Sequence, residues 1–570
     1  MFAPFLTLVI EMLTRKSFLN TFAYIAKAPF IYLLNIALVT LTLLMCYLVP
    51  KKSFALTIIT LIWLGLGIAN FILLNYRSTP IAPVDFINLL SMLSIIEIYF
   101  KPAQIVVMIA AIAATVLLII MVWKSSPKTK VQFKNVLLSI APVIIIAVIL
   151  FFFPRDKKTS SIDELNLAEA YEEYGFAYCF FTGLVDHGIE KPKDYSQQTI
   201  DKYKEQIGRA SSSEPNEKPN VIFLQMESFF DANQIKNITI SEDPTPNFNK
   251  LKTEYPSGYL SVPTIGAGTA NTEFEILTGM NIDFFGLGEY PYNSVLNKTT
   301  CESIAYNLSE LGYKTHAIHN YSATFYSRHL IFANLGFKTF TSLEYMQDAE
   351  TNTLGWAKDK VLTKEVLNTL SSTEETDFIY TISVQGHGRY PAEGVEEEQK
   401  IKITGLDNIA DTNKYEYFVN QMYECDEFIA ELIESLNNLE EKTVLVIFGD
   451  HLPSLNLQSN QLITEDRYKT EYVIWSNFGL NNEKKDLEAY ELSSYVLSLL
   501  NINNGYINRL HQNITDSKQK LKALNALQYD ILYGEKFIYS KSNPYNPTSI
   551  QMGINKIKIN GISTENMALY

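Results

Sequence analysis

Residues 264–279 read Thr-Ile-Gly-Ala-Gly-Thr-Ala-Asn-Thr-Glu-Phe-Glu-Ile-Leu-Thr-Gly, a glycine-rich turn followed by the start of a helix. Gly266 and Gly268 allow the backbone to approach a ligand closely. Residues 272–277 are typical of the first turns of a helix, and the free N–H groups at a helix start favour a bound anion. Thr269 stands at this junction, so its hydroxyl is placed to attack a phosphate held there.

The same stretch also has a purely structural interpretation. Thr269 can serve only as the N-cap of the helix. Thr272 can do so instead, because Thr272 with Glu275 fits a capping box. Taken alone, the stretch favours this structural interpretation, and the choice depends on the rest of the chain.

The charge of the chain divides it into two parts. Residues 1–155 carry 12 Lys and Arg but only three Asp and Glu, a balance of +9, so the remaining residues carry −23 to give the overall −14. The acidic second part is a poor candidate for nucleic-acid binding. The four cysteines show no CxxC spacing, which supports neither a zinc knuckle nor a dense disulfide framework.

Four long apolar runs predict a membrane domain in residues 1–155. Each is close to the roughly 20 residues that cross a bilayer, and none contains an acidic residue. The alternative, buried core helices, is disfavoured because the four runs lie close together. The runs are Phe30–Val49, Phe54–Leu74, Ile105–Trp123 and Val136–Phe153.

Two further apolar stretches are less suited to spanning. Met1–Leu13 is short and contains Glu11. We expect a shortened first span there, giving about five spans, because a basic n-region and a small-residue cleavage site of a signal peptide are not visible. Ile81–Tyr99 includes Asp85 and Glu97 and is predicted to be interfacial or re-entrant.

The orientation of the predicted spans depends mainly on one loop. The segment Lys124–Lys134 holds four lysines and should be cytoplasmic, which places the residues after Phe153 outside the cell. Arg15, Lys16 and Lys27 then lie outside as well, so the distribution of basic residues does not decide the matter.

The rest of the chain is predicted to form a tether, a catalytic domain and an appendage. Residues 156–216 combine an amphipathic aromatic segment with linker composition. From Pro219 onward, short apolar strands alternate with helical segments, which is typical of an α/β domain with a largely parallel sheet. We place this domain at residues 217–505 and the C-terminal appendage at residues 506–570.

Four of the predicted strands end in reactive side chains. Ligands of open α/β sheets bind at the carboxyl ends of strands, so these endings predict one shared site. The four strands with the residues that follow them are Val221–Met226 with Glu227, Lys314–Ile318 with His319, Phe378–Val384 with Gly386-His387-Gly388, and Thr443–Phe448 with Gly449-Asp450-His451.

Glu227, Asp450 and His451 offer two carboxylates and an imidazole, and Thr269 would add an alkoxide. This mixture suits Mn²⁺, Mg²⁺ or Zn²⁺, and ligand type alone does not choose among them. A divalent ion would lower the pKa of the Thr269 hydroxyl and neutralise charge on a phosphoryl oxygen. Each residue alone has a structural explanation, as a helix cap or a surface ion pair, but together with the glycine-rich turn they favour a metal site.

Three further residues are candidates for binding a phosphate. Arg328, in Tyr-Ser-Arg-His, can hold phosphate oxygens bidentately, although a solvated surface arginine is the alternative. His319 and His387 could stabilise a transferring phosphate or shuttle protons, although a histidine alone is more often structural.

Several of these motifs together resemble the lipoteichoic acid synthase family, whose members are polytopic phosphoglycerol transferases with an alkaline phosphatase/sulfatase-like catalytic domain. The resemblance covers most of the chain, and its most specific part is the block Thr-Ala-Asn-Thr-Glu-Phe-Glu. The motifs are Asn220-Val-Ile-Phe-Leu-Gln-Met-Glu-Ser-Phe, Asp243-Pro-Thr-Pro-Asn-Phe, Gly268-Thr-Ala-Asn-Thr-Glu-Phe-Glu-Ile-Leu-Thr-Gly, Phe325-Tyr-Ser-Arg and Phe448-Gly-Asp-His, with Ser17-Phe-Leu-Asn and Thr79-Pro-Ile-Ala-Pro-Val-Asp in the membrane part.

The resemblance implies roles for individual residues. Thr269 would be the nucleophile, and Mn²⁺ would be bound by Glu227, Thr269, Asp450 and His451. The residues that would contact glycerol phosphate are His319, Tyr326, Arg328 and His387. A sulfatase activity is disfavoured, because neither Cys nor Ser stands in a Cys/Ser-x-Pro-x-Arg context at the nucleophile position.

The resemblance also implies a multi-pass protein of the bacterial cell membrane with an extracellular catalytic domain. Its expected reaction is transfer of glycerol phosphate from phosphatidylglycerol to a lipoteichoic acid or related glycan acceptor, through a covalent intermediate on threonine. Two alternatives stay open. One is a phosphoethanolamine transferase acting on a lipid or glycan, and the other is a non-catalytic membrane protein that binds wall polymer.

Overall fold

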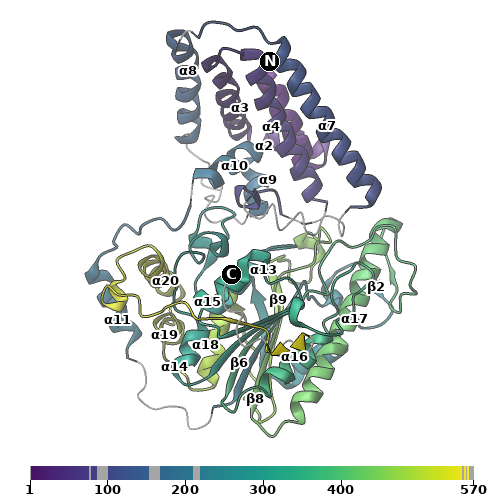
Figure 1. The fold of residues 1–570 in the computed structure, drawn as a ribbon, viewed down its shortest axis with the longest axis vertical. Helices are drawn as coiled ribbons and strands as arrows, with labels where there is room; N and C mark the ends of the chain where they lie inside the picture. Colours follow the sequence, from purple (N-terminus) through teal and green to yellow (C-terminus); the bar gives the residue numbers. More distant parts are fainter. Residues whose placement is uncertain are drawn as a thin grey trace. The chain divides into compact units, whose positions relative to one another are not determined.

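The structure of the chain is a computed structural model, drawn in Figure 1. It describes residues 2–75, 77, 79–86, 100–131, 133–152, 167–185, 187–209, 218–554, 558–559 and 562–563. Most of the predicted re-entrant stretch Ile81–Tyr99 and the linker around residues 210–217 lie outside the described residues. The chain divides into two compact units: Met1–His187 with Gly286–Glu289, and Gly188–Phe285 with Tyr290–Tyr570.

The first unit is helical and apolar, as the sequence predicts. Among the described residues, three helices are long and apolar enough to cross a membrane: Pro29–Leu48, Lys52–Leu73 and Pro102–Ser125. The helices of this unit are α1 (Phe2–Arg15), α2 (Phe18–Lys27), α3 (Pro29–Leu44), α4 (Lys52–Leu73), α7 (Pro102–Ser125), α8 (Phe133–Phe152), α9 (Leu167–Tyr174) and α10 (Phe176–Val185).

Polar side chains inside the first unit accept hydrogen bonds from the backbone N–H groups at the break between α9 and α10. Gly175 forms this break with φ +79°. The first N–H groups of α10 have no partner within their own helix, and they donate to side chains of α1 and α3: Phe176 N to Glu11 Oε1 at 2.8 Å, and Tyr178 N to Asn35 Oδ1 at 2.8 Å. The acidic residue in the short apolar helix α1 is therefore buried with defined partners.

The second unit is built on a sheet of nine described strands. Within the described chain, only β9 runs antiparallel to its neighbours, which confirms the predicted mostly parallel sheet. Across the sheet the order is β10 (Leu487–Glu488), β3 (Ser257–Ser261), β9 (Lys469–Ser476), β8 (Thr443–Gly449), β1 (Asn220–Met226), β6 (Asp377–Ile382), β4 (Lys314–His319), β5 (Thr339–Ser342) and β11 (Gln551–Met552).

Two pairs of two-residue strands lie outside this sheet. Both pairs are antiparallel. They are β2 (Thr239–Ile240) with β7 (Ile403–Thr404), and β12 (Lys558–Ile559) with β13 (Ile562–Ser563).

Helices cover both faces of the main sheet, and the residues of β1 alternate between them. Val221 and Phe223 pack into the hydrophobic cluster on one face, whereas Ile222 and Leu224 pack into the cluster on the other. Figure 1 shows α18, α19 and α20 on one side of the sheet and α17 on the other. Helices that contribute to the first cluster are α11 (Gln197–Ile207), α13 (Thr269–Thr278), α14 (Ile304–Glu310), α15 (Arg328–Asn334), α18 (Ala489–Leu499), α19 (Tyr506–Asn513) and α20 (Ser517–Leu532).

Three helices contribute to the second cluster: α12 (Pro246–Glu254), α16 (Val361–Leu370) and α17 (Ile409–Asn437). The C-terminal part of the chain takes part in this architecture. Helices α19 and α20 belong to the first cluster, and β11 pairs with β5 at the edge of the sheet. The helix expected near Ser517–Leu527 is α20.

The buried side chain of His511, on α19, holds the end of α13. Its Nε2 donates to the carbonyl oxygen of Gly279 at 2.7 Å, and Gly279 ends α13 in the left-handed conformation. Burial lowers the pKa of His511 to about 4. Between pH 6.5 and 4 the unfolded chain therefore binds a proton that the folded chain does not, so stability falls as the pH falls through this window.

We expect His511→Gln to flatten this acid loss of stability. The lowered pKa corresponds to about 3 kcal/mol of stability at neutral pH that is lost by pH 4, and glutamine keeps a donor without titrating. The measurement is the thermal unfolding midpoint of both proteins at pH 7.5 and pH 5. Equal acid shifts in the two proteins would contradict the assignment.

Candidate active site and metal centre

The four reactive strand endings lie side by side at one edge of the sheet. Strands β8, β1, β6 and β4 are consecutive neighbours and run parallel. Their carboxyl ends therefore bring Asp450 and His451, Glu227, His387 and His319 to the same edge. This is the clustering that the sequence predicts for one site.

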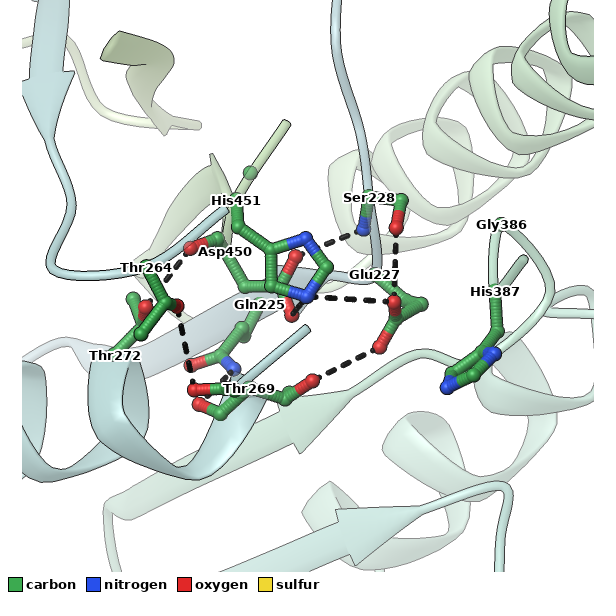
Figure 2. Close-up of polar contacts among 12 residues, drawn as sticks. Gln225, Glu227, Ser228, Thr264, Thr269, Thr272, Gly386, His387, Asp450 and His451 are labelled. Carbon is green, nitrogen blue, oxygen red and sulfur yellow. Dashed lines mark hydrogen bonds and ion pairs between the residues drawn. The ribbon is translucent and has the colours of Figure 1, made fainter. Parts of the chain in front are cut away.

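Glu227, Asp450 and His451 form a compact buried group (Figure 2). One ligand atom from each lies within 4.8 Å of the others. His451 Nε2 is 3.7 Å from Glu227 Oε1 and 3.5 Å from Asp450 Oδ2. The burial of both members rules out the interpretation of Asp450-His451 as a surface ion pair.

Hydrogen bonds around this group orient the side chains and leave two atoms without partners. Ser228 N donates to Asp450 Oδ1 at 2.8 Å, and Ser228 Oγ donates to Glu227 Oε1 at 2.9 Å. His451 Nδ1 lies 3.0 Å from the carbonyl oxygen of Leu452, which can only accept, so Nε2 carries the lone pair. Among the described residues, Asp450 Oδ2 and His451 Nε2 have no hydrogen-bond partner.

The electrostatics of the group fit a divalent cation. Burial, and then the charge of Glu227, raise the pKa of Asp450 well above its usual range. Burial lowers the pKa of His451, which favours the neutral imidazole. Two carboxylates and a neutral imidazole, with two unsatisfied atoms facing inward, are a donor set for Mn²⁺, Mg²⁺ or Zn²⁺, and the residues present fit such an ion.

Thr269 is the first residue of α13, and its hydroxyl faces the carboxylate group. Its Oγ1 donates to Glu227 Oε2 at 3.1 Å, as Figure 2 shows. Gly268 precedes it with φ 101°, and a Cβ there would lie 2.8 Å from the side chain of Thr264. Glycine is therefore needed at the point where the chain turns into the helix.

The capping interpretation of Thr272 does not hold. Thr272 lies inside α13, where its Oγ1 donates to the carbonyl oxygen of Asp450 at 2.8 Å. Glu275 instead accepts from Ile282 N at 2.9 Å. The helix thus begins three residues before the predicted boundary, and Thr272 fixes its first turn to the loop that carries Asp450.

Arg328 is buried, which rules out the solvated surface arginine. Its side chain is 2% exposed, and it forms an ion pair with Glu273 on α13. Its Nη1 lies 3.2 Å from His319 Nε2, and its Cζ lies 5.2 Å from the ring centre of Tyr326. His319, Tyr326 and Arg328 are thus together in one cluster.

His387 lies on the Glu227 side of the group in Figure 2. Its ring is 4.4 Å from that of Trp356, and its Nδ1 contacts the carbonyl oxygen of Gly388. His316, in contrast, is structural: it lies in the middle of β4, with Nδ1 2.8 Å from Thr339 Oγ1 and Nε2 3.1 Å from Asp377 Oδ1.

Sequence reasoning did not identify several residues that shape this site. Ser228 supports both carboxylates, Ser383 Oγ accepts from Glu227 N at 2.9 Å, and Glu273 pairs with Arg328. Ser228 directly follows Glu227, and Glu273 stands four residues after Thr269, a spacing that places both on one helix face. These two signals were present in the sequence, whereas the role of Ser383 required the sheet register.

Comparison with known proteins identifies the domain. The sulfatase family model matches residues 219–511. A Rhizobium meliloti (strain 1021) protein named for cyclic beta-1,2-glucan modification is 27% identical over 429 residues, covering 70% of this chain and 66% of that protein. The capsular polysaccharide biosynthesis protein RkpI of the same organism is 25% identical over 322 residues, covering 54% of this chain and 55% of RkpI.

Among solved structures, the chain is similar to Streptococcus pyogenes phosphoglycerol transferase GacH in complex with sn-glycerol-1-phosphate. The TM-score is 0.55 with 24% identity, covering 62% of this chain and 97% of that one. This likeness shows the fold, and with the family match it confirms the predicted sulfatase-like α/β domain. The chain spans about two thirds and about half of the lengths of the two Rhizobium meliloti relatives.

We expect Asp450→Asn to weaken metal binding by more than roughly 100-fold, because it removes one of two charged ligands from a buried group. The measurement is titration of metal-stripped, detergent-solubilised protein with Mn²⁺, followed by calorimetry. Asp516→Asn, at the exposed N-cap of α20, is the control and should leave the affinity unchanged. Equal affinities in all three proteins would remove Asp450 from the metal site.

Proposed function

The chain belongs to the sulfatase family, and we propose from this membership and from the geometry of the site that it transfers glycerol phosphate from phosphatidylglycerol to a glycan acceptor. The observation that carries the proposal is the hydroxyl of Thr269 at the start of α13, 3.1 Å from Glu227 within a group suited to a divalent ion. An unmodified threonine hydroxyl in this place suits phosphoryl transfer through a covalent intermediate.

In the proposed first step, Thr269 Oγ attacks the phosphorus of phosphatidylglycerol. A bond forms between phosphorus and Thr269 Oγ, the bond from phosphorus to the diacylglycerol oxygen breaks, and the proton lost by Thr269 ends on diacylglycerol. The N–H groups at the start of α13 favour the phosphate there. A divalent ion held by Glu227, Asp450, His451 and Thr269 would lower the pKa of the Thr269 hydroxyl and neutralise phosphoryl charge.

In the proposed second step, a hydroxyl of the acceptor attacks the phosphorus of glycerophosphoryl-threonine. The bond to Thr269 breaks, and the acceptor proton returns to Thr269, so the products are diacylglycerol and a glycerophosphorylated acceptor. Arg328, Tyr326 and His387 are proposed to contact the glycerol phosphate. His319 would act behind Arg328, because its Nε2 lies 3.2 Å from Arg328 Nη1.

The names of the relatives support a glycan acceptor and glycerol phosphate as the group moved. One Rhizobium meliloti relative is named for glucan modification and the other for capsular polysaccharide biosynthesis, and the protein of similar fold is a phosphoglycerol transferase. Among such acceptors, the sequence motifs favour a lipoteichoic acid chain.

The apolar helices suit a lipid donor. We propose a multi-pass protein of the bacterial cell membrane, with the loop Lys124–Lys134 in the cytoplasm and the catalytic unit outside. A donor and a leaving group that are both lipids explain why the catalytic domain is joined to helices long and apolar enough to span the bilayer.

We expect the detergent-solubilised protein, incubated with phosphatidylglycerol and Mn²⁺, to carry a glycerophosphate mass on Thr269. Mass spectrometry of the peptides locates the adduct, which should be absent with a chelator. Thr269→Ala should lower transfer by roughly 10³-fold or more, because it removes the attacking atom. Thr269→Ser is the matched control, since it keeps the hydroxyl, and should still form the adduct.

Other outcomes would redirect the proposal. A phosphoethanolamine mass on Thr269, formed from phosphatidylethanolamine instead, would change the donor and keep the mechanism. Full transfer by Thr269→Ala would remove the covalent mechanism. No adduct from either lipid, with both lipids intact, would leave a metal-binding protein without transferase activity.

A further inference from the structure

A buried ion pair stands one helical turn from Thr269. Glu273 is 0% exposed and Arg328 is 2% exposed at the side chain. Glu273 Oε1 lies 2.5 Å from Arg328 Nη2, and Arg328 Nε lies 3.2 Å from Oε1 and 3.1 Å from Oε2. Because Thr269 and Glu273 are four residues apart on α13, they share one face of the helix, with roughly 5–6 Å between their Cβ atoms.

The hydrogen bonds of Arg328 limit what it can offer a phosphate. A guanidinium has five N–H hydrogens. The Nε hydrogen and one Nη2 hydrogen are directed at Glu273, and one Nη1 hydrogen is directed at His319 Nε2. One hydrogen on Nη1 and one on Nη2 lie outside these contacts. Arg328 therefore has two of its five N–H hydrogens for a substrate oxygen.

The protonation of His319 follows from the same contacts. His319 Nδ1 lies 3.0 Å from the carbonyl oxygen of Ile382, which can only accept. The hydrogen of the neutral ring is therefore on Nδ1, and Nε2 accepts from Arg328. Burial, and then the charge of Arg328, lower the pKa of His319 well below its usual range. His319 adds no positive charge to this part of the site.

The charges of this cluster therefore cancel. Arg328 contributes +1, Glu273 contributes −1 and His319 contributes none. The contact of 2.5 Å between Glu273 Oε1 and Arg328 Nη2 is as short as a charge-assisted hydrogen bond between a carboxylate and a guanidinium. An arginine without this carboxylate would attract a second negative charge on the substrate phosphate, and the carboxylate removes that attraction.

We infer that Glu273 is a positioning residue that neutralises and orients Arg328, so that the site selects a phosphodiester with one negative charge over a phosphomonoester with two. The inference rests on the proposed function, whose donor is a phosphodiester. It assigns the choice between these two substrate classes to a residue whose side chain pairs with Arg328 and forms no hydrogen bond or ion pair, among the described residues, with the side chain of Thr269 or with the candidate metal ligands. A purely structural ion pair would affect stability without changing this choice.

The test compares the affinities of two probes. Glycerophosphoglycerol is a phosphodiester with one charge, and glycerol 1-phosphate is a monoester with close to two charges at pH 8, because its second pKa is about 6. The full chain is measured in detergent with saturating Mn²⁺ by calorimetry. Every protein carries Thr269→Ala so that neither probe is turned over, and the quantity compared is the ratio of the two Kd values.

We expect Glu273→Gln to raise the affinity for glycerol 1-phosphate roughly tenfold relative to the diester, because the charge of Arg328 is then uncompensated. Glu275→Gln is the matched control. Glu275 is buried on the same helix and accepts from Ile282 N, with no recorded contact to Arg328, so the ratio should not change.

Two further variants keep the inference testable if Glu273→Gln does not fold. Arg328→Gln leaves the Glu273 charge alone and should shift the ratio in the opposite direction, toward the diester. The double variant Glu273→Gln/Arg328→Gln removes both charges, so it should bind both probes more weakly while the ratio returns to that of the parent protein.

The inference is overturned if the ratio of the two Kd values is unchanged in the single variants that fold. It is also overturned if the parent protein, which carries only Thr269→Ala, binds neither probe or does not prefer the diester. Adduct formation from phosphatidylglycerol by the same variants with Thr269 restored tests the proposed function separately. An adduct with an unchanged ratio removes only the role of Glu273. No adduct on the wild-type chain removes the proposed function, whatever the ratio.

Discussion

Two buried carboxylates at neighbouring strand ends are the constraint on which this site depends. Glu227 follows β1 and Asp450 follows β8, and these strands pair along their length. Two like charges this close and this buried are costly unless a cation joins them or one is protonated. Ser228 donates to both carboxylates, but this leaves Asp450 Oδ2 and His451 Nε2 without hydrogen bonds among the described residues. A divalent ion bound there would offset the charge of the two carboxylates and give both atoms a partner.

The close approach of the backbone explains the glycines that flank these residues. A Cβ on Gly386 would lie 2.2 Å from the carbonyl oxygen of Glu227, and a Cβ on Gly449 would lie 2.2 Å from that of Phe229. Gly386 of Gly-His-Gly and Gly449 of Gly-Asp-His are thus needed for packing between adjacent strand ends. They bring the side chains of His387, Asp450 and Glu227 within reach of one site.

The fold and the main site could be predicted because both depend on local patterns. Apolar runs of bilayer length, alternating strands and helices, and polar residues directly after strands are readable along the chain. The Glu273–Arg328 pair joins residues 55 positions apart, and its existence depends on how α13 and α15 pack. The start of α13 was also predicted too late, because Thr272 resembles a cap in sequence but bonds to the Asp450 loop in the structure.

The charge of the whole chain and the charge of the site bear on different steps of the proposed reaction. The residues after 155 carry −23, so the summed field of the catalytic part does not attract an anionic lipid. At physiological salt the Debye length is about 8 Å, which screens exposed charges beyond that distance but not buried pairs. Phosphate recognition must therefore be local. In the proposed reaction, with Arg328 neutralised by Glu273, recognition would depend on a divalent cation, the start of α13 and the two remaining guanidinium hydrogens. An enzyme with the proposed donor in its own membrane would have little need of long-range attraction, because anchoring would already raise the local concentration of that donor.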